Sequence, residues 1–139
     1  MINFNYNYPD FSLENNLQYK LWIENCIEHF KLETGEISYT FVNDNELLDI
    51  NKELLNHDFY TDIITIDQRV GDIISADIFI SIDRIKDNSK ELETEFSEEL
   101  KRVIIHGLLH IVGFNDHSDN EKSEMRKQED FCISLFNSN

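Results

Sequence analysis

The sequence predicts an α+β fold in which one mixed sheet of about four strands packs with helices. Two observations predict this class. The periodic segments follow the order strand, helix, strand, helix, two strands and then helices, which is typical of mixed α+β domains. The length of 139 residues, with 40% hydrophobic and 29% charged residues, fits a single domain over residues 1–139 with one core.

The chain is expected to open with a strand and a helix. Residues 2–6 alternate apolar side chains with asparagine and are soon followed by Pro9, so they predict a strand. Ser12 is a helix-capping residue type, and the helix that it begins is expected to end near Gly35. The apolar face predicted for this helix consists of Leu13, Leu17, Leu21 and Trp22.

The middle of the chain predicts three more strands and one helix. Residues 37–42 are rich in β-branched and aromatic side chains and predict a strand, after which Asp44 is expected to cap a short leucine-rich helix. The apolar runs 63–66 and 73–80 flank Gly71. They therefore predict two strands that pair antiparallel.

The last part of the chain predicts helices. A short one is expected around residues 82–85, and a strongly apolar one ends at Gly113. The final helix is expected over residues 119–136, because the segment from Ser118 to Glu121 has the form of a capping box.

The charge balance limits the kinds of partner. The sequence has 28 Asp and Glu against 12 Lys and Arg, which gives a formal net charge of -16. A protein that coats nucleic acid by general attraction to phosphates is therefore disfavoured. An acidic chain still binds RNA locally where a few basic groups and a metal cation gather in one cleft.

Cysteine content and hydropathy indicate a cytoplasmic protein. Cys26 and Cys132 are too few for a disulfide scaffold, and both lie in apolar helical stretches, so we expect reduced thiols in the core. No apolar run approaches the roughly 18 residues of a membrane helix. The first residues lack the basic and apolar regions of a signal peptide.

Two histidines carry the strongest functional signal. His106 and His110 are four residues apart in the apolar helix, so they project from one helix face about one turn from each other. That geometry suits two imidazoles on one metal ion. A pair of hydrogen-bonded core histidines is the structural alternative.

The residues after the histidines favour the metal site. Gly113 can adopt a left-handed conformation and fold the chain back, so that a residue shortly after it reaches the histidines. This order resembles the motif H-x-x-x-H-x-x-G-x-x-ligand of the metzincins, in which three protein ligands leave one position open. Asp116 has the metzincin spacing and is the favoured third ligand, with the neighbouring His117 as the alternative. Zinc is the expected metal, as one ion.

A missing glutamate argues against a peptidase. Zinc peptidases place a glutamate directly after the first histidine as general base, and Gly107 stands there in this sequence. Phosphodiester cleavage suffers less from this loss, because RNA supplies its own 2'-hydroxyl or is attacked by a metal-activated water.

Most of the chain resembles the YbeY family of bacterial rRNA-maturation endoribonucleases. The resemblance is carried by His106-Gly107-Leu108-Leu109-His110 with Gly113, which matches the family mark H-G-x-L-H-x-x-G. The segments 61–65 and 77–80 resemble the family's T-D-V-L-S segment and a following strand. Three features depart from the family pattern. One more residue follows Gly113 than in the common pattern, so Asp116 takes the third-ligand position by spacing and His117 takes it only if the turn absorbs an insertion. Leu55 stands where the family has an arginine implicated in RNA cleavage, and Ala76 replaces a glycine.

The resemblance implies a zincin-like fold and a zinc-dependent, single-strand-specific endoribonuclease. It further implies a role in rRNA maturation, including 16S rRNA 3'-end processing, and in ribosome quality control, with ribosomal RNA or its precursors, and ribosomal proteins, as partners. His106, His110 and Asp116 are then the catalytic and metal-binding residues. Beside these residues, Arg102 lies one helical turn before His106 and is a candidate for a phosphate contact, with a solvated surface arginine as the equal alternative. His57 is a candidate acid or base, although a surface role is favoured for it.

Two other functions are weighed against the nuclease. One is a non-enzymatic ribosome-assembly factor with a structural metal, which the arginine lost at Leu55 favours. The other is a metal-dependent hydrolase of a peptide or small ester.

Overall fold

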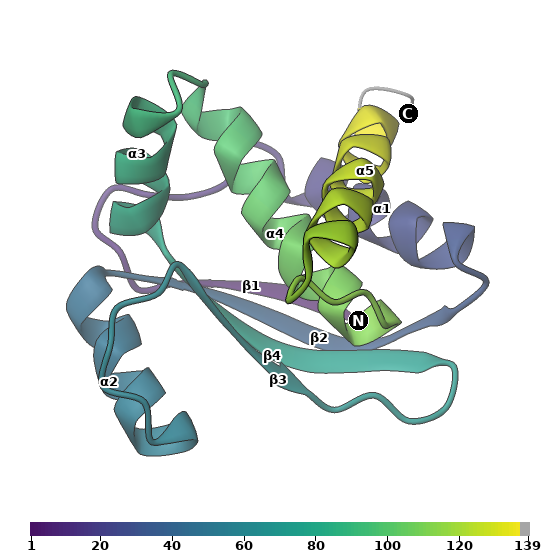
Figure 1. Cartoon of the computed structure of the whole chain (residues 1–139), viewed down its shortest axis with the longest axis horizontal. Coiled ribbons are helices and arrows are strands. Elements are labelled where there is room, and N and C mark those ends of the chain that lie inside the picture. The colour runs from purple at the N-terminus through teal and green to yellow at the C-terminus, as the bar shows by residue number, and fades with distance from the viewer. Residues whose placement is uncertain (137–139) are drawn as a thin grey trace.

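The structure, a computed structural model, describes residues 1–136 and confirms the predicted α+β class (Figure 1). Residues 137–139 of the predicted domain lie outside the described residues. The elements follow the predicted order: β1 (Ile2–Tyr6), α1 (Asn16–His29), β2 (Glu33–Val42), α2 (Asp44–Leu55), β3 (Ile63–Asp67), β4 (Ile73–Ser81), α3 (Ile82–Glu91), α4 (Phe96–Val112) and α5 (Asp119–Phe136).

The four strands form one mixed sheet in the order β1-β2-β4-β3. The first three are mutually parallel, whereas β3 pairs antiparallel with β4, as predicted for the two runs around Gly71. β3 is therefore an edge strand at one side of the sheet. The functional cleft forms along this edge.

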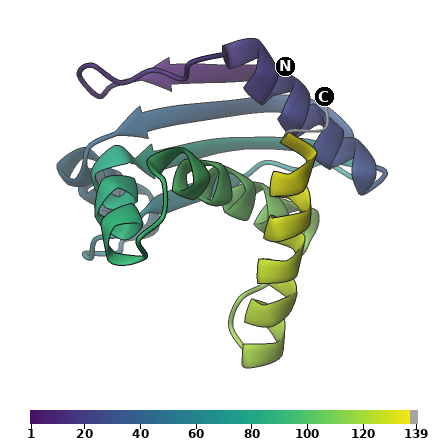
Figure 2. The same ribbon diagram turned by 90° about the horizontal axis from the view of Figure 1, so that it is seen from above.

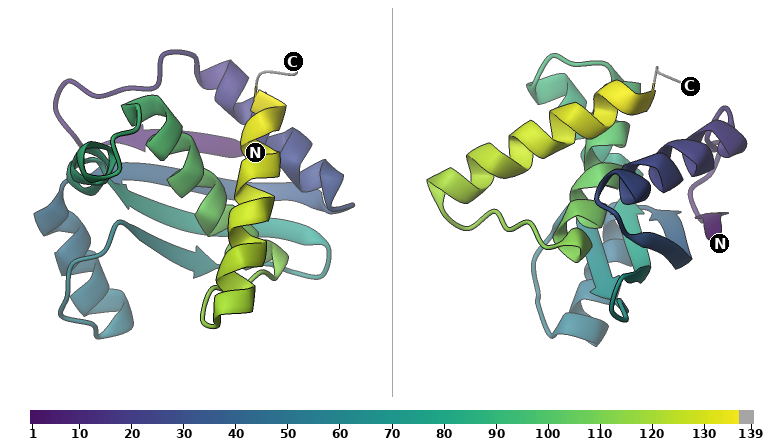
Figure 3. Two further views of the ribbon diagram at one scale, coloured as in Figure 1. Left: turned by 45° about the horizontal axis from the view of Figure 1, so that its top comes forward. Right: turned by 90° about the vertical axis from the view of Figure 1, so that its right-hand side faces the viewer.

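Helices cover both faces of the sheet. Figure 1 shows α1, α3, α4 and α5 on one side and α2 on the other, and Figures 2 and 3 show α4 running across the sheet with α5 beside it. The larger core joins α1, α4 and α5 to the sheet. A smaller apolar cluster of Val42, Leu47 and Ile64 lies on the side of α2. The face on the side of α2 is covered only in part, and along β4 fully buried residues accordingly alternate with partly exposed ones.

The prediction for the first helix was wrong in its bounds and its face. Asn15 rather than Ser12 caps α1, since the Asn15 side chain accepts a hydrogen bond from the Gln18 amide at 3.1 Å. Leu17 and Leu21 are 65% and 47% exposed. The buried side chains instead follow the helical spacing 19, 22, 23, 26 and 27, and this stripe decides which face packs. The helix ends at His29 because residues 33–42 pair with both neighbouring strands.

The later helices begin and end for the predicted reasons. Gly113 ends α4 with a backbone φ of 129°, which residues other than glycine rarely adopt. At the start of α5, Ser118 Oγ accepts from the Glu121 amide at 3.1 Å, and the Glu121 carboxylate accepts from the Ser118 amide at 2.9 Å. These two bonds form the predicted capping box.

The prediction for the cap of α2 was wrong by one residue, because Asn43 and not Asp44 caps this helix.

Two further features concern the core and the membrane. Cys26 and Cys132 are buried free thiols, as predicted. Within residues 1–136, none of the helices has the length and apolar composition that crossing a bilayer requires.

Candidate metal centre

Helix α4 is held close to the sheet by apolar side chains on either side of the histidines. Ile104, Ile105, Leu108 and Leu109 are fully buried, whereas His106 and His110 are only partly exposed and face the cleft beside β3. A Cβ atom added at Gly107 would lie 2.7 Å from Ile63 Cδ1 and 2.9 Å from Thr65 Oγ1 of β3. The glycine therefore permits the close approach of α4 to the sheet. The position used by the peptidase glutamate has no room for a side chain.

Replacing Gly107 with glutamate is expected to destabilise the protein and to create no peptidase. The side chain would have to displace Ile63 and Thr65, and such overpacking costs about 1–3 kcal/mol or more. Chemical denaturation would measure this loss. Ser97→Glu, at an exposed position in the first turn of the same helix, is the matched control and should change stability little. Equal unfolding midpoints for Gly107→Glu and the parent would contradict the packing explanation.

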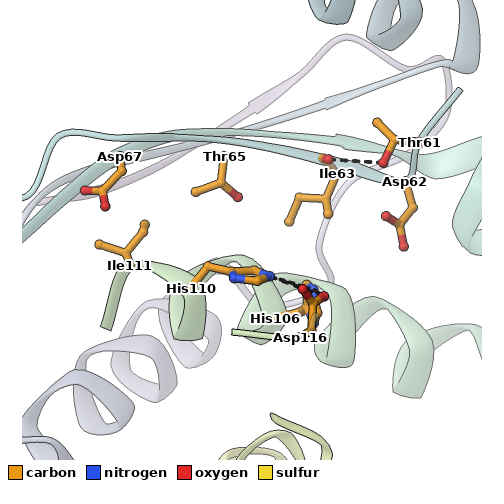
Figure 4. Close-up of a pocket in the computed structure, with 9 residues that line it drawn as sticks. All are labelled: Thr61, Asp62, Ile63, Thr65, Asp67, His106, His110, Ile111 and Asp116. Atoms are coloured by element: carbon orange, nitrogen blue, oxygen red, sulfur yellow. Dashed lines mark hydrogen bonds and ion pairs between the residues drawn. The ribbon is translucent and has the colours of Figure 1, made fainter. Parts of the chain in front are cut away.

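Three side chains converge in the cleft (Figure 4). The Nε2 atoms of His106 and His110 lie 3.1 Å apart, and Asp116 Oδ2 lies 3.3 Å from the first and 3.5 Å from the second. Ligand atoms bound at about 2.0 Å around a tetrahedral zinc ion are about 3.3 Å apart. The three atoms thus have the spacing of three corners of one zinc coordination sphere, with the fourth corner open.

The turn after α4 brings Asp116 to the histidines. The amides of Gly113 and Phe114 both donate to the Leu109 carbonyl oxygen at 3.0 Å, which closes the helix end. Arg69 Nη1 donates to the carbonyl oxygens of Ile111 and Val112 at 3.0 Å and so ties the β3–β4 turn to the same end. The structure thus groups Asp116 with the two histidines, whereas His117 is exposed and lies outside the group.

A buried glutamate fixes the orientation of His106. Glu129 on α5 is 5% exposed, and its Oε2 lies 2.7 Å from His106 Nδ1. An ionised carboxylate only accepts hydrogen bonds, so His106 Nδ1 carries the proton and Nε2 presents its lone pair to the cleft. This bond, with the nearby negative charge of Glu129, raises the pKa of His106. Carboxylates hold metal-binding histidines in this way.

Sequence reasoning missed Glu129, although a signal was present. The buried positions of α5 are 125, 129, 132 and 136, a helical stripe in which glutamate is the one charged member. Charged residues are rarely buried without a partner.

Arg102, the candidate phosphate contact, forms ion pairs with two carboxylates of α5. Its Nη1 donates to Glu129 Oε1 at 2.9 Å and its Nη2 to Asp130 Oδ1 at 2.8 Å. Arg102 therefore helps to hold Glu129 against His106, and it lines a smaller hollow together with Asp62 and His106.

The cleft is acidic and has a volume of about 440 Å³. Nine described residues line it, with no lysine or arginine among them: Thr61, Asp62, Ile63, Thr65, Asp67, His106, His110, Ile111 and Asp116. Burial raises the pKa of Asp62, an effect that the nearby His106 partly opposes. A phosphate group would meet mainly negative charge here unless a cation were bound.

The candidate His57 and the position of the missing family arginine both lie outside the cleft lining. His57 is exposed in the segment between α2 and β3, where its ring stacks on Phe59 with centroids 5.1 Å apart. Leu55, at the position of the family arginine, is the 41% exposed last residue of α2.

Comparisons with known proteins agree with the motif. The sequence matches the family model described as "Endoribonuclease YbeY" over residues 4–137. Proteins named "Endoribonuclease YbeY" from Flavobacterium johnsoniae and Flavobacterium psychrophilum are 47% and 45% identical to it over 136 residues. These matches cover 98% of this chain in both cases and 97% and 96% of the relatives.

A solved structure supports the fold. The solution structure of a Thermotoga maritima protein superposes with a TM-score of 0.66 at 20% identity and covers 98% of this chain and 89% of that one. Family match, relatives and motif together show that the chain belongs to the YbeY family of endoribonucleases.

Proposed function

We propose that this protein is a zinc-dependent endoribonuclease that cleaves single-stranded RNA at the site formed by His106, His110 and Asp116. The observation that carries the proposal is the spacing of 3.1–3.5 Å between the three ligand atoms in an acidic, solvent-open cleft. Two imidazoles and one carboxylate are a donor set that zinc accepts, and they leave one position open. Because of this spacing and donor set, we keep the prediction that the site binds one zinc ion.

The side chains of this chain prepare the cleft for phosphodiester cleavage. A bound zinc ion would supply a Lewis acid for a phosphoryl oxygen and an activated water. Glu129 keeps the proton of His106 on Nδ1, so that Nε2 remains a ligand atom. The carboxyl group of Asp62 faces the same space (Figure 4) and is available for proton exchange with the substrate.

RNA is favoured over peptide because of Gly107. No general base follows His106, and the Cβ contacts described above leave no space for one. RNA carries its own 2'-hydroxyl nucleophile beside the scissile phosphate, so no water has to be positioned, and Asp62 is available to accept the proton. We propose ribosomal RNA or its precursors as the substrate, with 16S rRNA 3'-end processing and ribosome quality control as the processes. Ribosomal proteins as partners, a cytoplasmic location and one domain over residues 1–139 are part of this proposal.

The test is cleavage of a labelled single-stranded RNA by purified protein. We expect cleavage that stops on chelation and returns when zinc is added back, because the acidic cleft needs a cation to hold phosphate. The same sequence annealed into a duplex should be cleaved much more slowly. Gel analysis of the products and metal analysis of the untreated protein are the measurements.

The alternatives predict different outcomes. A non-enzymatic assembly factor would bind ribosomal subunits without turning over RNA at any metal concentration. Hydrolysis of unstructured peptides that chelation stops would instead favour another hydrolase. Either result would overturn the ribonuclease proposal.

A further inference from the structure

The segment that connects α2 to β3 exposes aromatic side chains in the residues just before Thr61 and Asp62 of the cleft. Phe59 and Tyr60 are 55% and 56% exposed, and His57 stacks on the Phe59 ring. We call His57, Phe59 and Tyr60 the aromatic rim. Aromatic side chains carry much of the energy of binding interfaces, so an adjacent exposed pair is a candidate binding surface.

The backbone of the aromatic rim is anchored. Asn51 of α2 is 1% exposed and donates from Nδ2 to the Phe59 carbonyl oxygen at 3.0 Å, while the His57 amide donates to the Asn51 carbonyl oxygen at 3.1 Å. Lys52 pairs with Asp58 at 3.4 Å. A buried amide therefore fixes a segment whose rings stay exposed. This arrangement lowers the entropy that the rings would lose on binding a flat partner.

The aromatic rim continues directly into the metal cleft. Tyr60 precedes Thr61 and Asp62, which line the cleft, and the Ser81 amide donates to the Asp62 carbonyl oxygen at 3.0 Å. Two residues span at most about 7 Å. On its other side Tyr60 borders a second hollow of about 440 Å³, with Asp44, Asn45 and Arg84.

The charges around the aromatic rim favour bases over phosphates. Arg84 is paired with Asp44 and Asp87, both at 2.9 Å, and Lys52 with Asp58. The cations next to the rings are thus balanced by carboxylates, in a chain of net charge -16. Every nucleobase has an uncharged π face, so an acidic protein can stack on bases even where its negative charge disfavours contacts with phosphates.

We propose that the aromatic rim stacks unpaired bases of the RNA strand whose phosphate lies at His106, His110 and Asp116. This inference rests on the proposed function and specifies how its substrate is held. Bases within a duplex are stacked on each other and cannot offer their faces. The aromatic rim therefore accounts for a preference for single strands through stacking rather than through charge.

The test uses the full chain and a short single-stranded RNA that carries 2-aminopurine, whose fluorescence falls on stacking. For the double variant Phe59→Leu, Tyr60→Leu we expect KM for cleavage to rise about tenfold or more. The kcat should stay within about twofold, because neither ring reaches the metal cleft, and the fluorescence quenching should be lost. The ring-retaining variant Phe59→Tyr, Tyr60→Phe should restore both readouts.

Phe131→Leu is the matched control, since Phe131 is another exposed aromatic residue, on α5, where its ring contacts His29 of α1. It should behave as the parent protein. If the parent cleaves RNA but the double variant keeps the parent's KM and quenching, the proposal that the aromatic rim binds bases is overturned, while the proposed nuclease activity is supported. If quenching is lost in the double variant but the parent never cleaves, the nuclease fails and the stacking surface stands.

Discussion

Replacing His110 with alanine is expected to abolish RNA cleavage, lowering kcat/KM by at least about a thousandfold, while the protein stays folded. A thousandfold loss corresponds to about 4 kcal/mol of transition-state stabilisation, which is within what a catalytic metal supplies. His110 is partly exposed, and its hydrogen-bond and ion-pair contacts in the described residues are with His106 and Asp116. Its removal therefore takes away a metal ligand without opening the core.

Metal content, cleavage rate and thermal unfolding should be measured on the same preparations. Asp116→Ala is expected to lose bound metal as His110→Ala does, because Asp116 Oδ2 lies within 3.5 Å of both imidazole nitrogens. His117→Ala is the matched control, one residue further along and exposed. A reversed result, with metal lost in His117→Ala and kept in Asp116→Ala, would make His117 the third ligand. Full cleavage by His110→Ala would contradict the site altogether.

Local signals predicted most of the fold because they act over a few residues. The Ser118–Glu121 capping box and the positive φ of Gly113 depend on neighbouring atoms, and both features were found where the sequence indicated. The face of α1 was misjudged because leucines at 17 and 21 compete with a longer stripe that includes Trp22. Only packing against α5, where Trp22 Nε1 donates to the Cys132 carbonyl oxygen at 2.7 Å, decides between them.

In the candidate site, too, residues that are close in sequence could be predicted and residues on another helix could not. His106 and His110 share a helix turn, and Asp116 follows one tight bend, so the sequence brought these three together. Glu129 lies 23 residues beyond His106 on another helix, and no local rule specifies which α5 residue faces α4. The partners of Arg102 were missed for the same reason, since Glu129 and Asp130 also lie on α5.

Replacing Glu129 with glutamine is expected to lower metal affinity about 10- to 100-fold, the range for partners of metal-binding histidines. Glu129 has two acceptor oxygens, and each already receives a donor, one from Arg102 and one from His106. Glutamine offers one oxygen and one amide nitrogen, so one of these donors would face another donor. If the amide nitrogen faces His106, the imidazole proton moves to Nε2 and the ligand lone pair is lost.

The same substitution should lower the free energy of unfolding of the metal-free protein by about 1–3 kcal/mol, because the buried bonds from Arg102 and His106 lose their charged acceptor. Metal titration and chemical denaturation of the metal-free protein separate the two effects. Asp130→Asn is the matched control, because it also loses one carboxylate that pairs with Arg102, but at a 60% exposed side chain. It should change stability by less than about 1 kcal/mol and leave metal affinity unchanged. Equal metal affinity in Glu129→Gln and Asp130→Asn would mean that His106 holds its orientation without the carboxylate, and that α5 contributes packing alone to the site.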